Sequence, residues 1–186
     1  MRNLRQIVIV LVAIVVPSSA VVAAPQTPSR PAKPAAVSSA PRRAVAAPTK
    51  DPFIGVWKLN REKSKYESGG APTSFTRTYE DRGGGTIFMT TDVTIPQGST
   101  RAYLVYRRDG KPYPEAAVGV QSIRMVSVTA LDPRTEDVYL VVDGKTSDTP
   151  STITIAADGM TMTQVVSGRD GEGKAFTNTI VYDRQP

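Results

Sequence analysis

Arg77 has the most informative surroundings of any charged residue in this sequence. It lies two positions after Phe75 and two before Tyr79, in a run where polar and bulky residues alternate. In a β-strand this spacing places the three side chains on one face. An inward-facing arginine must pair with an acid, stack on aromatic rings or bind an anionic group. Two interpretations stay open: a structural arginine, and one that contacts the carboxylate or phosphate head of a ligand.

Three more residues share an inward face with apolar neighbours and could contact the same ligand. Met89 would offer an apolar surface, and Gln164 and Asn178 would offer amide donors and acceptors. Interior amides can also satisfy one another, so a structural role is open for them as well. The predicted ligand-binding residues are Arg77, Phe75, Tyr79, Met89, Gln164 and Asn178.

Most familiar catalytic and metal chemistry is excluded by composition, because the 186 residues include no Cys and no His. Thiolate nucleophiles, Ser-His-Asp triads and zinc sites of the usual kinds are therefore absent. Gly144-Lys145-Thr146 resembles the end of a phosphate-binding loop but lacks the first glycine and a following helix. The acids fall mostly at turns and strand ends. We therefore predict no enzymatic activity, no cofactor and no metal site.

The charge divides the chain into three regions. Residues 1–50 hold seven cations and no anion, so the remaining 16 Lys and Arg nearly balance the 17 Asp and Glu. Residues 1–24 combine two arginines, a short apolar run and small residues, which is typical of a signal peptide, either cleaved or kept as an anchor. Residues 25–50 read as a disordered, basic Pro/Ala-rich linker. We expect export to the periplasm or the exterior, and no nucleic-acid binding.

Residues 51–186 read as a single all-β domain. Four Asp-Gly pairs separate alternating runs, and Asp-Gly is a strong hairpin signal. The expected strands are 53–60, 74–81, 86–95, 100–108, 120–130, 136–142, 151–156, 160–167 and 175–183. We predict an antiparallel up-and-down meander of eight to nine strands that closes into a barrel, since closure removes exposed sheet edges.

The two ends of this domain resemble those of lipocalin-like (calycin) barrels. Gly55-Val56-Trp57 stands in the first strand, and Arg184 follows the last one. The stretches DPFIGVWKLNREKSKY and KAFTNTIVYDRQ are also similar to a group of secreted bacterial lipocalin-like proteins of unassigned function. The resemblance implies that Trp57 and Arg184 close one end of the barrel, with the cation over the indole.

Three classes of function follow. The first is an exported, non-enzymatic barrel that binds a small, mostly apolar or amphipathic ligand. The second is an envelope-associated interaction or structural module, displayed on the linker, whose barrel is filled by side chains. Its plug would consist of Phe53, Trp57, Met89, Met160, Met162 and Phe176. The third, an enzyme based on carboxylates or tyrosine, is disfavoured. The basic linker could add a weak contact with an anionic envelope surface, and the oligomeric state stays open.

Overall fold

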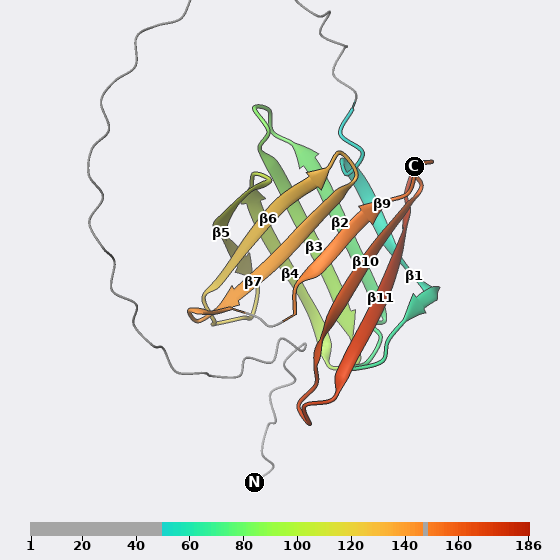
Figure 1. Cartoon of the computed structure of the whole chain (residues 1–186), viewed down its shortest axis with the longest axis vertical. Coiled ribbons are helices and arrows are strands. Elements are labelled where there is room, and N and C mark those ends of the chain that lie inside the picture. Colours follow the sequence, from blue (N-terminus) through green and yellow to red (C-terminus); the bar gives the residue numbers. More distant parts are fainter. Residues whose placement is uncertain (1–49, 147–148) are drawn as a thin grey trace, which may run out of the picture. The chain divides into compact units, whose positions relative to one another are not determined.

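A closed antiparallel β-barrel is formed by the residues that the computed structural model describes, 50–146 and 149–186 (Figure 1). No helix occurs among these residues, and so none that could cross a membrane. The predicted signal peptide and all of the predicted linker except Lys50 lie outside the described residues. The all-β class, the antiparallel meander and the barrel closure are thus as predicted.

The barrel is a continuous ring of hydrogen-bonded strands. The strands are β1 (Gly55–Lys65), β2 (Ser74–Asp81), β3 (Ile87–Ile95), β4 (Gly98–Tyr106), β5 (Asp109–Ala117), β6 (Arg124–Asp132), β7 (Thr135–Val142), β8 (Lys145–Thr146), β9 (Ser151–Ile155), β10 (Thr161–Arg169) and β11 (Ala175–Arg184). Neighbours in sequence pair throughout most of the ring, β1 pairs with β11, and β7 pairs with both β6 and β9. The two-residue β8 only extends β7.

The predicted strand number was wrong, because the ring has ten strands and β8 adds an eleventh to the sheet. The missed strand is β5, whose Pro112 and Pro114 lack the backbone N–H that a ladder requires. Only three residue pairs join β5 to β4, from Ala102↔Ala117 to Leu104↔Glu115. The prolines therefore hid a strand that closes the ring mainly through its pairing with β6.

Side chains fill much of the barrel interior. We call the two ends of the barrel the Trp57 end, where β1 and β10 begin, and the Tyr66 end, where β2 and β11 begin. Trp57 and its neighbours pack into a buried cluster that includes Phe53, Tyr79, Tyr106, Met162 and Tyr182. Several other apolar residues that pack against this core remain partly exposed: Leu59, Phe75, Met89, Tyr113, Val138, Val142 and Val166. Phe176, Val126 and Leu140, nearer the Tyr66 end, are buried as well, so buried and partly exposed side chains occur along the whole interior.

One residue of the predicted plug lies outside the barrel. The prediction that Met160 faces inward with Met162 is wrong, because Met160 is 54% exposed. It stands in the turn that precedes β10, before the strand alternation begins. Parity therefore does not apply to it, and Met162 alone of the two belongs to the core.

Candidate functional site

The Trp57 end is closed by one arginine whose three nitrogens each donate to a backbone carbonyl. The Arg184 guanidinium carbon lies 4.2 Å from the centre of the Trp57 ring. Its Nε donates to the Gly159 carbonyl at 2.6 Å, its Nη1 to the Ile54 carbonyl at 2.8 Å, and its Nη2 to the Pro52 carbonyl. Position 55 favours glycine, because its φ is 141°, which other residues rarely adopt, and because a Cβ there would displace Arg184 Nη1, only 2.5 Å away. This accounts for the spacing of the Gly-x-Trp motif.

Arg77 faces the interior from the middle of β2. Its register partners are Trp57 on β1 and Thr91 on β3. The guanidinium carbon lies 5.0 Å from the ring centre of Phe75 and 5.4 Å from that of Tyr182, within the range of cation–π attraction. The two rings meet edge to face at 5.4 Å. Arg77 is therefore held by aromatic faces, as one of the predicted options requires.

Three hydrogen-bond donors in this interior have no acceptor. Arg77 Nε and the hydroxyls of Tyr66 and Tyr79 are buried, and none has a partner. The Arg77 guanidinium lies within hydrogen-bonding reach of the Tyr79 hydroxyl and acts to lower its pKa, although neither Arg77 Nε nor this hydroxyl has a partner at good hydrogen-bond geometry. Burial raises the pKa of Tyr79, so this hydroxyl keeps its proton and remains a donor. Arg77 as a whole stays partly exposed, so part of it borders space that water can enter.

Tyr66 comes from the connection between β1 and β2, which Asn178 anchors. The side-chain oxygen of Asn178 accepts from the backbone N–H groups of Glu67 at 2.8 Å and Ser68 at 3.2 Å. Its amide nitrogen donates to the Ser68 carbonyl at 3.0 Å. Asn178, predicted as a ligand contact, thus uses its hydrogen-bonding groups on this connection. It positions Tyr66 in the chain that enters β2.

Gln164 and Met89 occupy different surroundings. The Gln164 amide nitrogen donates to the Ser151 hydroxyl at 3.1 Å, and its oxygen accepts from the Tyr182 hydroxyl at 3.4 Å. Gln164 is buried, and its bonds are to the protein. Met89 pairs in register with Tyr79 and Leu104 and packs partly exposed against the core. Of the predicted set, Phe75, Arg77 and Met89 therefore stay partly exposed, whereas Tyr79 belongs to the buried cluster.

A buried carboxylate lies nearer the Trp57 end. Glu136 on β7 is 1% exposed, and its Oε2 accepts from Arg108 Nε at 2.6 Å. Arg108 Nη1 also donates to Asp51 at 2.6 Å, and its guanidinium carbon lies 4.2 Å from the Phe53 ring centre. Burial raises the pKa of Glu136 to about 6, although the positive charges of Arg108 and Arg77 oppose that rise. Glu136 thus acts on Arg77 at a distance while it pairs with Arg108.

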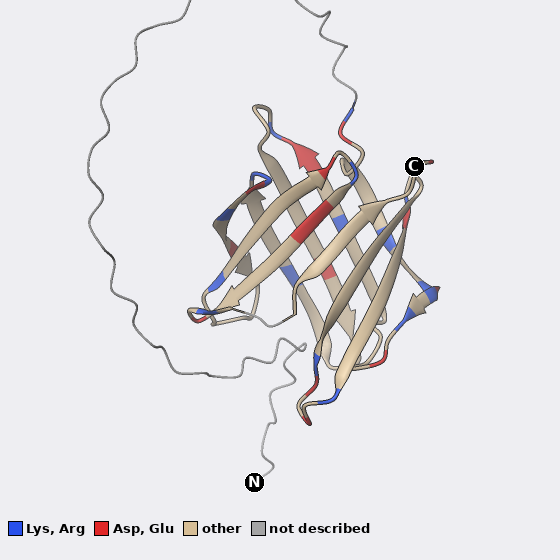
Figure 2. Ribbon diagram, in the orientation of Figure 1, with Lys and Arg blue, Asp and Glu red and all other residues tan. Residues whose placement is uncertain are grey.

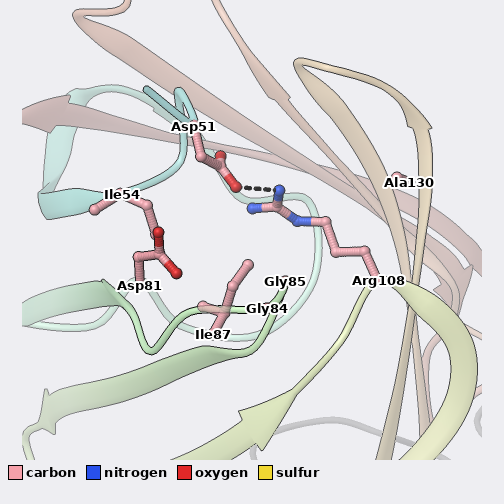
Figure 3. Close-up of a pocket in the computed structure, with 8 residues that line it drawn as sticks. All are labelled: Asp51, Ile54, Asp81, Gly84, Gly85, Ile87, Arg108 and Ala130. Carbon is pink, nitrogen blue, oxygen red and sulfur yellow. Dashed lines mark hydrogen bonds and ion pairs between the residues drawn. The ribbon is translucent and has the colours of Figure 1, made fainter. Parts of the chain in front are cut away.

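The same arginine borders a shallow depression at this end of the barrel. The depression measures about 350 Å³ and is lined by Asp51, Ile54, Asp81, Gly84, Gly85, Ile87, Arg108 and Ala130. Figure 3 shows the Asp51 and Arg108 side chains turned toward each other across it. Arg108 Nη2 is buried and has no partner. The ion pair fixes the start of the described chain against the β4–β5 connection.

Sequence reasoning missed the inward position of Tyr66, Glu136 and Arg108. Tyr66 belongs to a connection rather than a strand, so no alternation signals its direction. Arg108 also lies between strands, and Glu136 follows directly after the first residue of β7. Most other charged residues lie at turns and strand ends (Figure 2). Within the described residues, no group of three or more acidic side chains is arranged to hold a metal ion.

Comparison of the chain with protein-family models and with curated proteins finds no match. The closed barrel and the geometry of Trp57 and Arg184 are consistent with a lipocalin-like protein. The structure therefore supports the fold, and membership of a lipocalin-like family enters only as part of a proposal.

Proposed function

We propose that this chain is a non-enzymatic, lipocalin-like barrel that binds a small, mostly apolar ligand in the half toward the Tyr66 end. The supporting observation is that Phe75 and Val166, in that half, pack against the core yet stay partly exposed. Apolar walls in contact with water favour an apolar ligand, because its binding removes that surface from water.

The setting of the barrel belongs to the same proposal. Residues 1–24 direct the chain to the periplasm or the exterior, and the basic stretch 25–50 gives it a weak contact with the envelope surface. An exported carrier or sensor of apolar molecules is consistent with these features and with the absence of Cys and His.

The test is fluorescence titration with N-phenyl-1-naphthylamine, an uncharged apolar probe. Val166→Phe places a ring in the proposed cavity, whereas Val165→Phe places one on the outer wall, where Val165 is 38% exposed. We expect Val166→Phe to weaken binding at least about tenfold, and Val165→Phe to change it by less than about twofold. Unchanged tryptophan emission before probe addition would show that both variants keep the packing around Trp57.

Two outcomes would contradict the proposal: no binding by the wild type, or equal binding by both variants. The second candidate, an envelope-associated interaction or structural module with a filled barrel, would then be favoured. The observation that supports this second candidate is the tightly buried cluster around Trp57, Tyr79, Met162 and Tyr182. Native mass spectrometry of protein from its own host would give independent evidence, because a co-purifying small molecule would add a defined mass.

A further inference from the structure

The outside of the barrel is apolar on one side. Nine large apolar residues are exposed in the part of the chain that the structure describes, and six of them belong to β4, β7 and the β5–β6 connection: Tyr103, Val105, Val118, Val120, Ile123 and Tyr139. The outer faces of β2, β10 and β11 carry mostly threonine: Thr76, Thr78, Thr161, Thr163, Thr177 and Thr179. Exposed apolar residues that gather in one region indicate an interaction surface. We call the outer face of β3 to β7, with the β5–β6 connection, the apolar wall.

Strand pairing makes the apolar wall continuous. Buried and exposed residues alternate along β4 from Tyr103 to Tyr106, so the exposed ones face outward. Register pairs link the strands through apolar side chains: Phe88↔Val105, Tyr103↔Ala116, Pro114↔Met125 and Met125↔Val141. The β5–β6 connection is fixed at both ends, because the Val118 N–H donates to the Arg101 carbonyl at 2.8 Å and the Ile123 N–H donates to Asp143 at 2.8 Å.

The composition and size of the wall suit a protein partner. The Phe88 and Tyr103 rings are parallel within 1°, and the Arg82 guanidinium carbon lies 4.9 Å from the Phe88 ring centre. Aromatic residues, methionine and arginine are enriched in protein interfaces. Strands of eight or nine residues are about 30 Å long and five of them span about 24 Å, so the wall covers about 700 Å². This is close to the 800 Å² or so that each partner buries in a standard interface.

The charges on the wall favour a second copy of this chain. Two exposed ion pairs lie on opposite sides of Tyr103 along the strands, Arg82–Glu80 toward the Trp57 end and Arg101–Asp92 toward the Tyr66 end. In a two-fold arrangement centred on Tyr103 the facing strands are antiparallel, so Arg82 faces Asp92 of the second copy. Residues 51–186 hold 16 cations and 17 anions, so two copies repel each other little. An anionic membrane would favour an excess of cations, which these paired charges do not provide.

We infer that the apolar wall binds a second copy of this chain in a two-fold dimer centred on Tyr103. The wall lies outside the barrel, so this inference does not depend on the proposed ligand. The dimer also covers the junction between β4 and β5, which only three residue pairs join.

The test is sedimentation velocity of the full chain from about 1 to 100 µM, because a dimer with a Kd of about 10 µM dissociates within that range. Tyr103→Glu is compared with Val165→Glu, on the outer face of β10, because the two residues are 37% and 38% exposed. We expect Tyr103→Glu to weaken the dimer at least about tenfold, since two carboxylates then meet within an apolar contact, and Val165→Glu to change it less than about twofold. Unchanged emission of the buried Trp57 would show that both variants keep the core packing.

Exchange of charges tests the two-fold arrangement itself. Arg82→Glu should weaken the dimer about threefold or more, a modest effect because exposed ion pairs are weak. Adding Asp92→Arg to this variant should restore the affinity to within about twofold of the wild type, because the facing charges are then opposite again.

Three outcomes would overturn the inference. The first is a monomer at every concentration, and the second is an equal effect of Tyr103→Glu and Val165→Glu. The third is a monomer that binds phosphatidylcholine vesicles and loses this binding in Tyr103→Glu, because the wall would then contact lipid. A dimer that Asp92→Arg does not restore in the Arg82→Glu background would overturn the two-fold arrangement centred on Tyr103.

Discussion

Two arginines that face the barrel interior differ in their hydrogen-bond partners. Arg184, at the Trp57 end, donates to the carbonyls of Gly159, Ile54 and Pro52 and lies over the Trp57 indole. Arg77, farther inside, has aromatic faces but a buried Nε with no acceptor. A cation that serves the fold obtains its partners from the fold. Arg184 thus obtains its partners from the fold, whereas the structure provides no acceptor for Arg77 Nε.

Neighbouring side chains repeat this contrast. Trp57 donates its indole N–H to the Phe53 carbonyl at 2.8 Å and is fully buried. The buried hydroxyls of Tyr66 and Tyr79 find no acceptor. These two hydroxyls, like Arg108 Nη2, thus differ from the satisfied indole. The following experiments test whether that division is one between structure and binding.

The largest effect is expected at Trp57. Trp57→Ala removes a fully buried ring from the closed end, and large-to-small core substitutions of this kind cost about 3 to 5 kcal/mol. Trp57 is the only tryptophan of the chain, so unfolding in urea should be followed by circular dichroism. The emission of the native wild type should be blue-shifted. Emission already at the solvent-exposed position would contradict the burial of this residue.

Arg184 should come next. Arg184→Met keeps apolar contact with the indole but leaves the carbonyls of Gly159, Ile54 and Pro52 without their charged donor. The expected loss of unfolding free energy is about 2 to 3 kcal/mol. Urea denaturation measures it, and Lys58→Met, at an exposed position of β1, is the control. A loss no larger than in the control would mean that Arg184 does not complete the barrel.

The parts of the fold that depend on neighbouring residues in the sequence, such as hairpin turns and strand faces, were predictable. The Asp-Gly pairs predicted hairpins. In the Asp143-Gly144 turn both φ values are positive, 49° and 77°, as hairpin turns of this kind require. Period-two alternation placed Arg77 on the face of Phe75 and Tyr79. β5 was not predicted, because Pro112 and Pro114 are residues that sequence rules exclude from strands. The barrel tolerates them there, since only three residue pairs join β5 to β4.

The site was only partly predictable, for a related reason. Arg77 lies within a regular strand, so its direction follows from parity. Tyr66 lies in a connection, and its direction depends on the bonds that Asn178 makes with Glu67 and Ser68. Whether Arg77 has an acid partner depends on Glu136 and Arg108, which meet only when distant strands close the ring. These contacts depend on residues that are far apart in the sequence, so no local sequence pattern predicts them.

A smaller effect is expected from Glu136 as pH changes. Burial raises the pKa of this carboxyl from 4.5 to about 6, so the folded state holds the proton more tightly than the unfolded state. Its contribution is therefore most favourable below about 4.5 and declines by about 2 kcal/mol as pH rises to 6. Unfolding free energies of wild type and Glu136→Gln between pH 4.5 and 7 measure this. A wild-type slope that persists in the variant would assign it to another group.

The smallest effect on stability should come from Arg77, and it bears most directly on the comparison with Arg184. Arg77→Met removes the cation–π contacts with Phe75 and Tyr182 but also removes a buried, unpaired donor. Stacking of this kind contributes about 0.5 to 2 kcal/mol and an unpaired donor costs about 1 to 3 kcal/mol, so the two nearly cancel. We expect the unfolding free energy without ligand to change by less than about 1 kcal/mol in either direction, clearly less than in Arg184→Met. Urea denaturation of both variants in one buffer decides the matter. A loss at Arg77 as large as that at Arg184 would mean that both arginines support the fold, and the division between a structural end and a binding interior would no longer hold.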